Sequence, residues 1–219
     1  LLRHGWRVRA LARRVPEGAD PAIEWIAGDA MNRAAVLRAA KGTHAIFHGV
    51  NPPGYRNWGR LVLPMLDNSI AAARATGARL ALPGTIYNYD VRCVAVAGPD
   101  TPHLPHTAKG AIRAEMERRL AETPGLRALV LRAGDFFGPR AGNNWLSQGI
   151  IRPGRPVRGA IYPGRLEIGH AWAYLPDVGE TFARLLDVEA ELPGFATHHF
   201  AGHWTDGTGF LAALGQAAG

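Results

Sequence analysis

Cysteine and lysine are both scarce in this 219-residue sequence, which contains one cysteine, Cys93, and two lysines, Lys41 and Lys109, against 23 arginines. A single cysteine excludes an internal disulfide and a zinc site built from thiolates. No apolar run approaches the roughly 18 residues of a membrane span, and no basic stretch followed by an apolar one indicates a signal peptide. We therefore expect a soluble cytoplasmic protein with no membrane partner.

The surplus of arginine gives a net charge of +7 and an isoelectric point near 10.3. A nucleic-acid partner would require these charges to cluster, but no basic run is longer than Arg13-Arg14 or Arg118-Arg119. The sequence therefore argues against nucleic-acid binding, while one or two arginines suffice to bind a nucleotide phosphate. With 47% hydrophobic and 20% charged residues, the composition is that of a globular domain that buries a core.

Strand-like and helix-like stretches alternate along the chain. The first residues, "LLRHG", resemble a last helical turn that ends at Gly5, because glycine readily adopts the left-handed conformation of a helix stop. Strands are expected at 6–13, 23–28, 43–50, 78–84, 126–134 and near 197–200. Helices are expected at 29–42, 61–75, 109–122 and near 177–186 and 207–214. This alternation predicts an α/β fold with a doubly wound parallel sheet.

Five segments carry a resemblance to one known family. They are "LLRHGWRVRALARR" at the start, "GDA" at 28–30, "PGTIYNY" at 83–89, "VLRAGDFFGPR" at 130–140 and "YLPDVGETFARLL" at 174–186. In this order they resemble the extended short-chain dehydrogenases/reductases, specifically the NAD-dependent epimerase/dehydratase family. The resemblance implies a Rossmann-like fold, with an NAD(P)-binding portion at 1–134 and a small substrate lobe at 135–219 that returns to the core.

The sequence departs from this family at its start. The family's first strand leads into a glycine-rich turn that holds the cofactor pyrophosphate, and here the sequence begins just after that place. In the usual strand order the first strand lies in the middle of the sheet. Without it, two half-sheets would lie about 9–10 Å apart, because strands are spaced by roughly 4.8 Å. We therefore expect the full protein to extend upstream.

Several residues are candidates for cofactor binding. The resemblance places Arg13 and Arg14 where an arginine accepts the 2′-phosphate of NADP, so it favours NADP, with NAD possible. Asp29 has two compatible interpretations, as a contact of the adenine amino group or as the N-cap of the following helix. His48 and Gly49 would lie along the cofactor, with glycine allowing its close approach.

The catalytic pattern of the family is incomplete in this sequence. The resemblance implies a YxxxK motif, in which the lysine lowers the pKa of the tyrosine and binds the nicotinamide ribose, with an upstream Ser or Thr. Lys109 fits the lysine position, but Pro105 stands where the tyrosine belongs. The expected Ser position falls on Pro83 or Gly84. Proline transfers no proton, so the proton donor stays open.

Three residues could replace the missing groups, and each has a plainer interpretation. Thr85 could simply be a turn residue, Tyr87 a packed aromatic ring and His106 an exposed loop residue. A histidine near its ordinary pKa is a capable acid or base. Lys109 itself is either the ribose contact or a solvated residue in the first turn of its helix. We take Lys109, Thr85 and Tyr87 as the candidate catalytic residues.

Two residues after the strand at 126–134 are candidates for substrate contact. Asp135 could meet the substrate or form a turn, and Phe136 could line a pocket or pack in the core. The histidines at 198, 199 and 203 raise the question of a metal, but neighbouring residues of a strand point to opposite faces. We therefore predict no metal site.

Two functions follow from these observations. The first is an NAD(P)-dependent oxidoreductase or epimerase that acts on a hydroxyl or keto group of a small or sugar-like substrate. The alternative is a non-catalytic NAD(P)-binding sensor or scaffold, which the prolines at both expected proton-transfer positions favour. The resemblance also makes a homodimer plausible, through the helices that follow the family's fourth and fifth strands.

Overall fold

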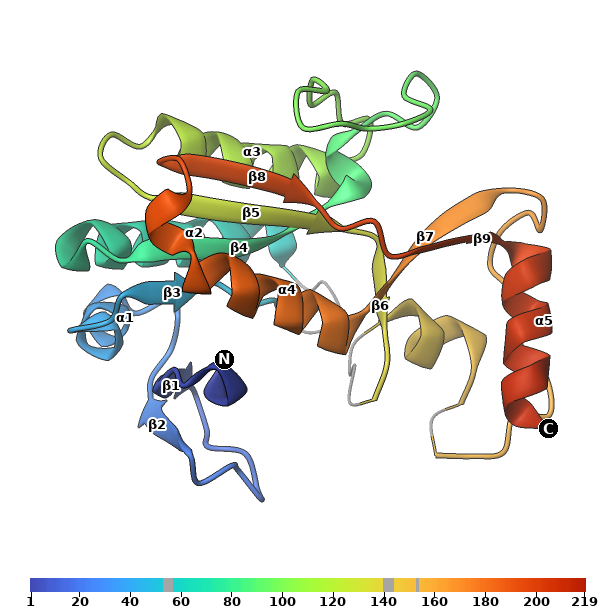
Figure 1. Ribbon diagram of the computed structural model, residues 1–219, viewed down its shortest axis with the longest axis horizontal. Coiled ribbons are helices and arrows are strands. Elements are labelled where there is room, and N and C mark those ends of the chain that lie inside the picture. The colour runs from blue at the N-terminus through green and yellow to red at the C-terminus, as the bar shows by residue number, and fades with distance from the viewer. Residues whose placement is uncertain (53–56, 140–143, 153) are drawn as a thin grey trace. The chain divides into compact units, whose positions relative to one another are not determined.

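The computed structural model describes residues 1–52, 57–139, 144–152 and 154–219, and the chain forms two compact units (Figure 1). Unit 1 comprises Leu1–Arg132 and Glu180–His198, and unit 2 comprises Ala133–Gly179 and His199–Gly219. Each unit is therefore built from two separate stretches of chain. Unit 1 is completed only by residues that follow most of unit 2.

The strands of unit 1 form two sheets. Strands β1 (Val8–Ala12) and β2 (Ile23–Ala27) make a parallel pair. A second sheet has the order β3-β4-β5-β8, formed by β3 (Ala45–Phe47), β4 (Arg79–Thr85), β5 (Ala128–Ala133) and β8 (Phe195–His199). In the described residues the strand order is thus interrupted between β1 and β3, where the resemblance places the family's first strand.

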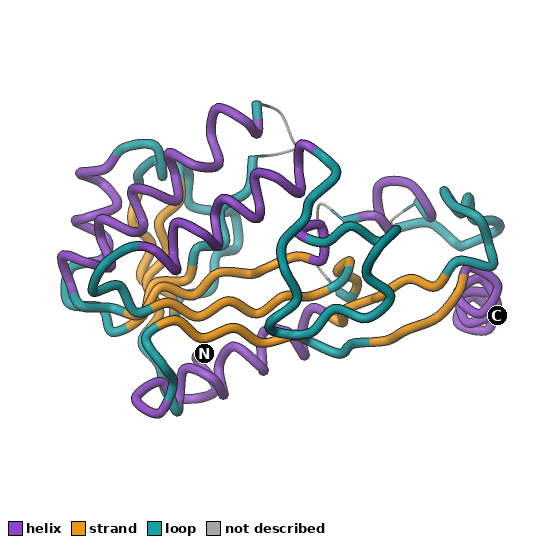
Figure 2. Tube along the Cα trace, turned by 90° about the horizontal axis from the view of Figure 1, so that it is seen from above, coloured by secondary structure: helices purple, strands orange, loops and turns teal. Residues whose placement is uncertain are grey.

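Helices cover the strands of unit 1 on both sides (Figure 2). They are α1 (Arg33–Ala40), α2 (Trp58–Thr76), α3 (Ala108–Glu122) and, from Glu180 on, α4 (Leu175–Asp187). Helices on both faces of a parallel sheet define the doubly wound architecture. The predicted fold class is therefore confirmed.

The main core of unit 1 lies between α2, α3 and the strands β4 and β5. On α2 the apolar residues recur every three or four positions, at 58, 62, 66, 70 and 73, and all are buried. This spacing keeps them on one face of the helix. On the strand side Leu80, Leu82 and Val130 are at most 1% exposed. Burial of a side chain of this size contributes about 1.5–3 kcal/mol.

Two helices end at the glycines predicted from the sequence, but one helix begins later than predicted. Gly5 and Gly77 have φ values of 78° and 71° at the ends of a short 3-10 turn and of α2. The predicted N-cap at Asp29, however, is wrong, because α1 begins later and Asn32 accepts the hydrogen bond from Ala35 N. Asp29 instead accepts one from Met31 N, which closes the preceding turn.

A buried arginine joins β4 to the segment before β8. Arg79 is 1% exposed, and its guanidinium donates to the Glu189 carboxylate and to the carbonyl oxygens of Ala128, Glu189, Leu192 and Pro193. A buried charge is tolerated when it is paired and fully hydrogen-bonded. Arg79 therefore fixes residues 189–193 to the sheet.

Unit 2 contains a three-stranded sheet in the order β6-β7-β9. It is formed by β6 (Asp135–Phe137), β7 (Gly169–Tyr174) and β9 (His203–Asp206), with β6 parallel and β9 antiparallel to β7. A short helical turn spans Leu146–Ile150. Asp206 caps α5 (Gly207–Ala218) by accepting a hydrogen bond from Gly209 N. None of the helices within the described ranges is long and apolar enough to cross a membrane.

An ion-pair cluster attaches the N-terminal turn to α4 and makes the stability of unit 1 depend on pH. His4 lies 2.5 Å from Asp187 and 3.1 Å from Glu180, and its hydrogen bonds to these carboxylates raise the pKa of the imidazole. The folded pKa then exceeds the unfolded value of about 6.5. The stabilisation is therefore complete below about pH 6.5 and is lost as the pH rises through the folded pKa.

We expect the urea midpoint of unfolding to fall more steeply between about pH 6 and about pH 8 in the wild type than in His4→Gln. His44→Gln is the matched control, because His44 is exposed and its replacement should leave the slope unchanged. If the urea midpoint changed equally steeply with pH in all three proteins, His4 would not be the source of this pH dependence.

Candidate functional site

The turn that follows β4 holds two of the three candidate catalytic residues. Thr85 ends the strand with an extended backbone, and its hydroxyl accepts a hydrogen bond from Tyr87 N at 3.3 Å. A 3-10 turn over Ile86–Asn88 follows at once. The threonine thus acts as the cap of this turn, as its plainer interpretation predicted. Its hydroxyl also lies 3.4 Å from Asn88 Oδ1.

The first turn of α3 packs directly on this turn. Thr107 caps the helix by accepting from Gly110 N at 3.0 Å. Gly110 is buried so closely that a Cβ atom built on it would lie 2.2 Å from the Tyr87 carbonyl oxygen and 2.9 Å from Pro105 Cβ. Lys109 is exposed beside it. The fold therefore packs the first turn of α3, which contains Lys109, on the turn that contains Tyr87 and follows Thr85.

His106, the third possible proton donor, lies in the loop before α3 rather than in this turn. Its Nδ1 is 3.5 Å from Asp90 Oδ1. Hydrogen bonds from Arg92 hold the pKa of the Asp90 carboxyl well below its usual range. The carboxylate at Asp90 is therefore shared between Arg92 and His106.

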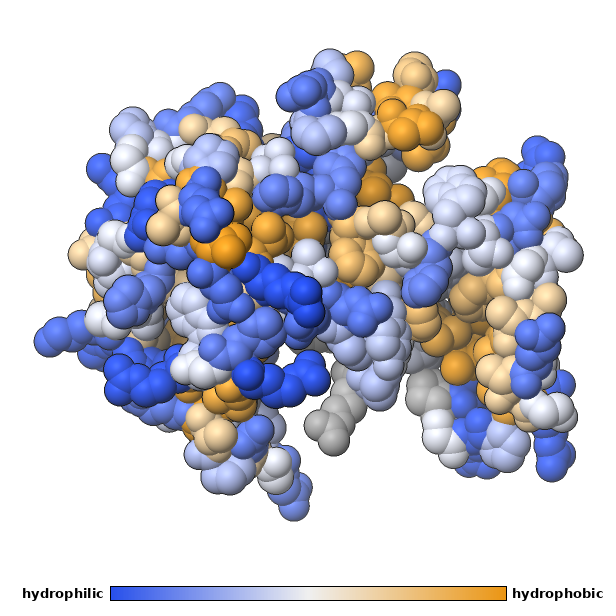
Figure 3. Space-filling model, viewed as in Figure 1, coloured by the Kyte–Doolittle hydropathy of each residue, from blue (hydrophilic) through white to orange (hydrophobic). Residues whose placement is uncertain are grey.

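The loop that leads from the turn to α3 exposes several apolar side chains. Val91, Val96 and Leu104 are 71%, 89% and 60% exposed, and the apolar patch is visible in Figure 3. The loop is anchored by the polar contacts of its two ends, at Asp90 and at His103.

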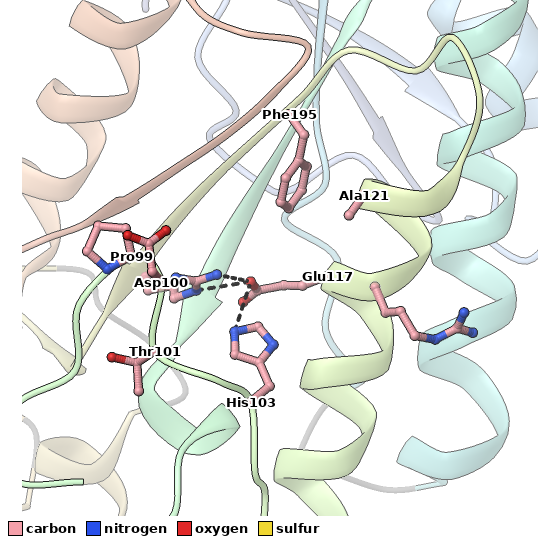
Figure 4. Close-up of a pocket in the computed structure, with 9 residues that line it drawn as sticks. Pro99, Asp100, Thr101, His103, Glu117, Ala121 and Phe195 are labelled. Atoms are coloured by element: carbon pink, nitrogen blue, oxygen red, sulfur yellow. Dashed lines mark hydrogen bonds and ion pairs between the residues drawn. The ribbon is translucent and has the colours of Figure 1, made fainter.

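A buried polar network joins the turn to α3 and β5, and Figure 4 shows its central residue, Glu117. Glu117 of α3 accepts from Asn88 Nδ2 at 2.7 Å and from Arg132 Nε and Nη2 of β5 at 3.0 and 2.7 Å. All three residues are at most 4% exposed. The Arg132 guanidinium also lies over the Tyr89 ring, 5.9 Å from its centroid. The network thus fixes β5, α3 and the turn to one another.

An open pocket of about 340 Å³ lies against this network. In Figure 4 the Phe195 ring and Ala121 form an apolar wall, and Glu117 and His103 lie opposite. Burial lowers the pKa of the His103 imidazole, although the Glu117 carboxylate 3.7 Å away opposes the shift. The residues that line this pocket include none of the predicted site residues. We therefore place neither cofactor nor substrate in it.

The candidate cofactor residues lie after the strands β1, β2 and β3. Gly28 N donates to Ala12 O at 2.9 Å, so the segments that follow the parallel strands β1 and β2 leave the sheet side by side. Arg13 and Arg14 on the first segment are exposed, and Asp29 follows on the second. Arg13 and Arg14 are thus exposed to solvent on the segment that lies beside the one with Asp29.

His48 was predicted as a cofactor contact, and the structure buries it. It is 5% exposed, its Nδ1 lies 2.8 Å from Ser69 Oγ, and its Nε2 has no hydrogen-bond partner among the described residues. Burial, with the charge of Arg113 adding to it, lowers the pKa of His48 to about 4. The imidazole is therefore neutral near pH 7. Gly49 beside it is exposed.

The lowered pKa of His48 gives a pH dependence opposite to that of His4. The folded value of about 4 lies below the unfolded value of about 6.5. This contribution is therefore complete above about pH 6.5 and lost as the pH falls towards 4. His48→Gln should flatten the loss of stability measured by urea unfolding across this acid range. An unchanged slope in that variant would show that other groups cause the acid destabilisation.

The candidate substrate residues lie in unit 2, on consecutive positions of β6. Successive residues of a strand face opposite sides, so Asp135 and Phe136 point away from each other. Asp135 Oδ2 lies 2.8 Å from His170 Nε2 of β7. Sequence reasoning missed His170, although the alternation in "GHAWAY" places it on the same face as Trp172. Within the described ranges, no three His, Cys, Asp or Glu side chains could hold a metal ion.

Comparisons with known proteins show which solved structures share this fold. No protein-family model matches the sequence, and no curated protein matches it. Solved structures do match. MoeE5 in complex with UDP-glucose and NAD shares 21% identity at a TM-score of 0.73, over 99% of this chain and 75% of that one. A UDP-galactose 4-epimerase shares 19% at a TM-score of 0.72, over 98% and 76% of the two chains.

A dTDP-glucose 4,6-dehydratase from Streptomyces venezuelae, with NAD bound, shares 18% identity at a TM-score of 0.66, over 92% of this chain and 67% of that one. These structures belong to NAD-dependent epimerases and dehydratases, the proteins that the sequence segments resemble. The chain shares their Rossmann-type fold. The predicted resemblance is therefore confirmed at the level of the fold.

Proposed function

We propose that this chain belongs to the extended short-chain dehydrogenases/reductases, binds a nicotinamide dinucleotide and acts on a hydroxyl or keto group of a small or sugar-like substrate. The nicotinamide supplies hydride acceptance or donation when it is bound. The ligands bound in the structural neighbours, UDP-glucose and NAD in MoeE5, support this class of reaction.

The observation that carries the proposal is the packing of the first turn of α3 on the turn after β4. This packing brings Gly110, the chain neighbour of Lys109, against the segment that holds Thr85 and Tyr87. An ammonium stabilises a nearby anion and donates hydrogen bonds to hydroxyl groups. Lys109 would therefore bind the nicotinamide ribose, and the hydroxyl of Thr85 or Tyr87 would hold the reacting oxygen of the substrate.

The finer part of the proposal is a preference for NADP. Arg13 and Arg14 are exposed just after β1, and a guanidinium binds a phosphate through two hydrogen bonds. Asp29, which leaves the sheet beside them, would accept from the adenine amino group. The arginines are thus assigned to the 2′-phosphate and Asp29 to the adenine amino group of the same nucleotide.

Calorimetric titration of NADPH and NADH into the protein tests this proposal. A hydrogen bond to a charged group contributes about 1.5–3 kcal/mol, so Lys109→Ala should weaken both cofactors by about 10-fold to 100-fold. Arg13→Ala should weaken NADPH by a similar factor and leave NADH unchanged. Lys41→Ala is the matched control, because it removes the only other lysine, which is exposed at the end of α1.

Three results would decide against the proposal. Binding of neither nucleotide would rule out the oxidoreductase. Equal losses of nucleotide affinity in Lys109→Ala and Lys41→Ala would show that Lys109 does not bind the cofactor. Tight binding without turnover of any sugar or small alcohol, followed by the absorbance of the reduced nicotinamide, would favour the non-catalytic sensor instead.

A further inference from the structure

The open pocket beside the Glu117–Arg132 pair, which we call the α3 pocket, lies wholly within unit 1. Its lining comes from the loop before α3, from α3 itself and from the strands β5 and β8. Its volume of about 340 Å³ is that of a small-molecule site. Because the predicted cofactor and catalytic residues lie elsewhere, a ligand of this pocket would be a further one.

One wall of the α3 pocket is apolar. Phe195, the first residue of β8, directs its ring into the pocket, and Ala121 of α3 lies beside it (Figure 4). The Pro99 ring adds a further apolar group to the lining. Aromatic and aliphatic groups of this kind bury the apolar part of a ligand. The wall therefore favours a ligand with a flat apolar ring.

The charged groups around the α3 pocket are predominantly acidic. Asp100 lines the pocket with an exposed carboxylate that forms no ion pair within the described ranges. Next to it Glu117 and Arg132 balance each other. Farther along α3 two guanidinium groups, of Arg118 and Arg119, are shared among three carboxylates, those of Asp67, Glu115 and Glu122. Acidic groups thus prevail here, although the whole chain has a net charge of +7, and the pocket favours a cation.

The remaining polar group of the lining does not oppose a cation. Burial lowers the pKa of the His103 imidazole, so the ring is neutral near pH 7. Its Nε2 lies 3.5 Å from Asn88 Nδ2 and 3.7 Å from Glu117 Oε2, and the ring packs edge-on against Tyr89 with centroids 5.4 Å apart. The imidazole therefore belongs to the buried network and adds no positive charge to the pocket.

We propose that the α3 pocket binds an aromatic amine, in which a short chain joins an ammonium group to a flat ring. The ring packs against Phe195 and Ala121, and the ammonium lies at the Asp100 carboxylate. A cation also gains from the face of a nearby aromatic ring. The inference is independent of the proposed function, because it uses none of the residues assigned to the cofactor or to catalysis.

An NMR titration of the protein with 2-phenylethylamine at pH 7 tests this site, with 2-phenylethanol and phenylacetate as neutral and anionic probes of similar shape. Small ligands of this kind bind weakly, so we expect a dissociation constant on the order of millimolar for the amine. The alcohol should bind at least about 3-fold more weakly, because it lacks the charge that pairs with Asp100. Phenylacetate should bind more weakly still, since its carboxylate is repelled.

Three variants examine the two halves of the pocket separately. Ala121→Phe fills the pocket from an exposed helix position and should weaken the amine at least about 10-fold. Phe195→Leu keeps an apolar side chain but removes the ring, and should weaken it about 3-fold to 5-fold. Asp100→Asn should reduce the affinity for the amine by a similar factor and leave that for the alcohol unchanged. Urea unfolding of each variant checks that the fold is retained.

The matched control is Glu17→Gln, which removes another exposed carboxylate that forms no ion pair in the described part of the chain. It should bind the amine as the wild type does. Absence of amine binding, equal affinities for the amine and the alcohol, or undiminished binding in a folded Ala121→Phe variant would overturn the inference. Equal effects of Asp100→Asn and Glu17→Gln would show that the amine responds only to the overall charge of the protein.

Discussion

Replacing Glu117 by alanine should lower the free energy of unfolding by about 3–5 kcal/mol, as measured by urea denaturation, because it leaves a buried charge without its partner. Glu117 accepts hydrogen bonds from Arg132 and Asn88, and all three side chains are at most 4% exposed. In the variant the Arg132 guanidinium loses its counter-ion, and Asn88 loses its acceptor. The turn with Thr85 and Tyr87 would lose its support.

The double variant Glu117→Leu with Arg132→Met is the informative control. Replacing a buried ion pair by apolar side chains of similar volume is often neutral or stabilising. The double variant should therefore regain most of the stability that the single variant loses. A loss below about 1 kcal/mol in Glu117→Ala would mean that water reaches the site and pairs with Arg132.

Replacing Gly110 by alanine should destabilise the protein by about 3 kcal/mol or more, at or above the upper range of overpacking costs. The added Cβ would lie 2.2 Å from the Tyr87 carbonyl oxygen, so the turn or α3 has to move. Movement there separates Lys109 from Thr85 and Tyr87. We therefore expect the variant to lose NADPH affinity in calorimetry as well as stability in urea unfolding.

Gly59 supplies the matched control for this prediction. It also lies in the first turn of a helix, α2, but a Cβ atom added there would meet nothing within 4 Å. Gly59→Ala should therefore raise stability by up to about 1 kcal/mol, the ordinary gain from alanine over glycine in a helix. If both variants changed stability alike, the close packing at Gly110 would not be responsible.

The fold of unit 1 was predictable because its elements have local signals. The helix expected at 61–75 is α2, whose apolar residues recur at helical spacing, and the helix expected at 109–122 is α3. The strand expected at 126–134 is β5, which is apolar except for Arg132 and is buried along its whole length. Such a run is typical of a strand covered on both faces.

Parts of the site were not predictable for an equally physical reason. The pairs Glu117–Arg132 and Asp135–His170 join residues 15 and 35 positions apart, and no short-range pattern relates their members. The strands β6 and β9 have only three and four residues, too few to establish a period. Asp29 and Asn32 are both good N-caps, so the helix start could not be assigned from residue type.

The bonds of Arg79 have a consequence for synthesis on the ribosome. Its guanidinium finds four of its acceptor groups only on residues 189–193, more than 100 positions downstream of β4. Until that segment emerges, β4 must either keep this charge in water or bury it unpaired, which is costly. Domains generally fold as units during translation. The four-stranded sheet therefore matures only after residues 189–193 have been made.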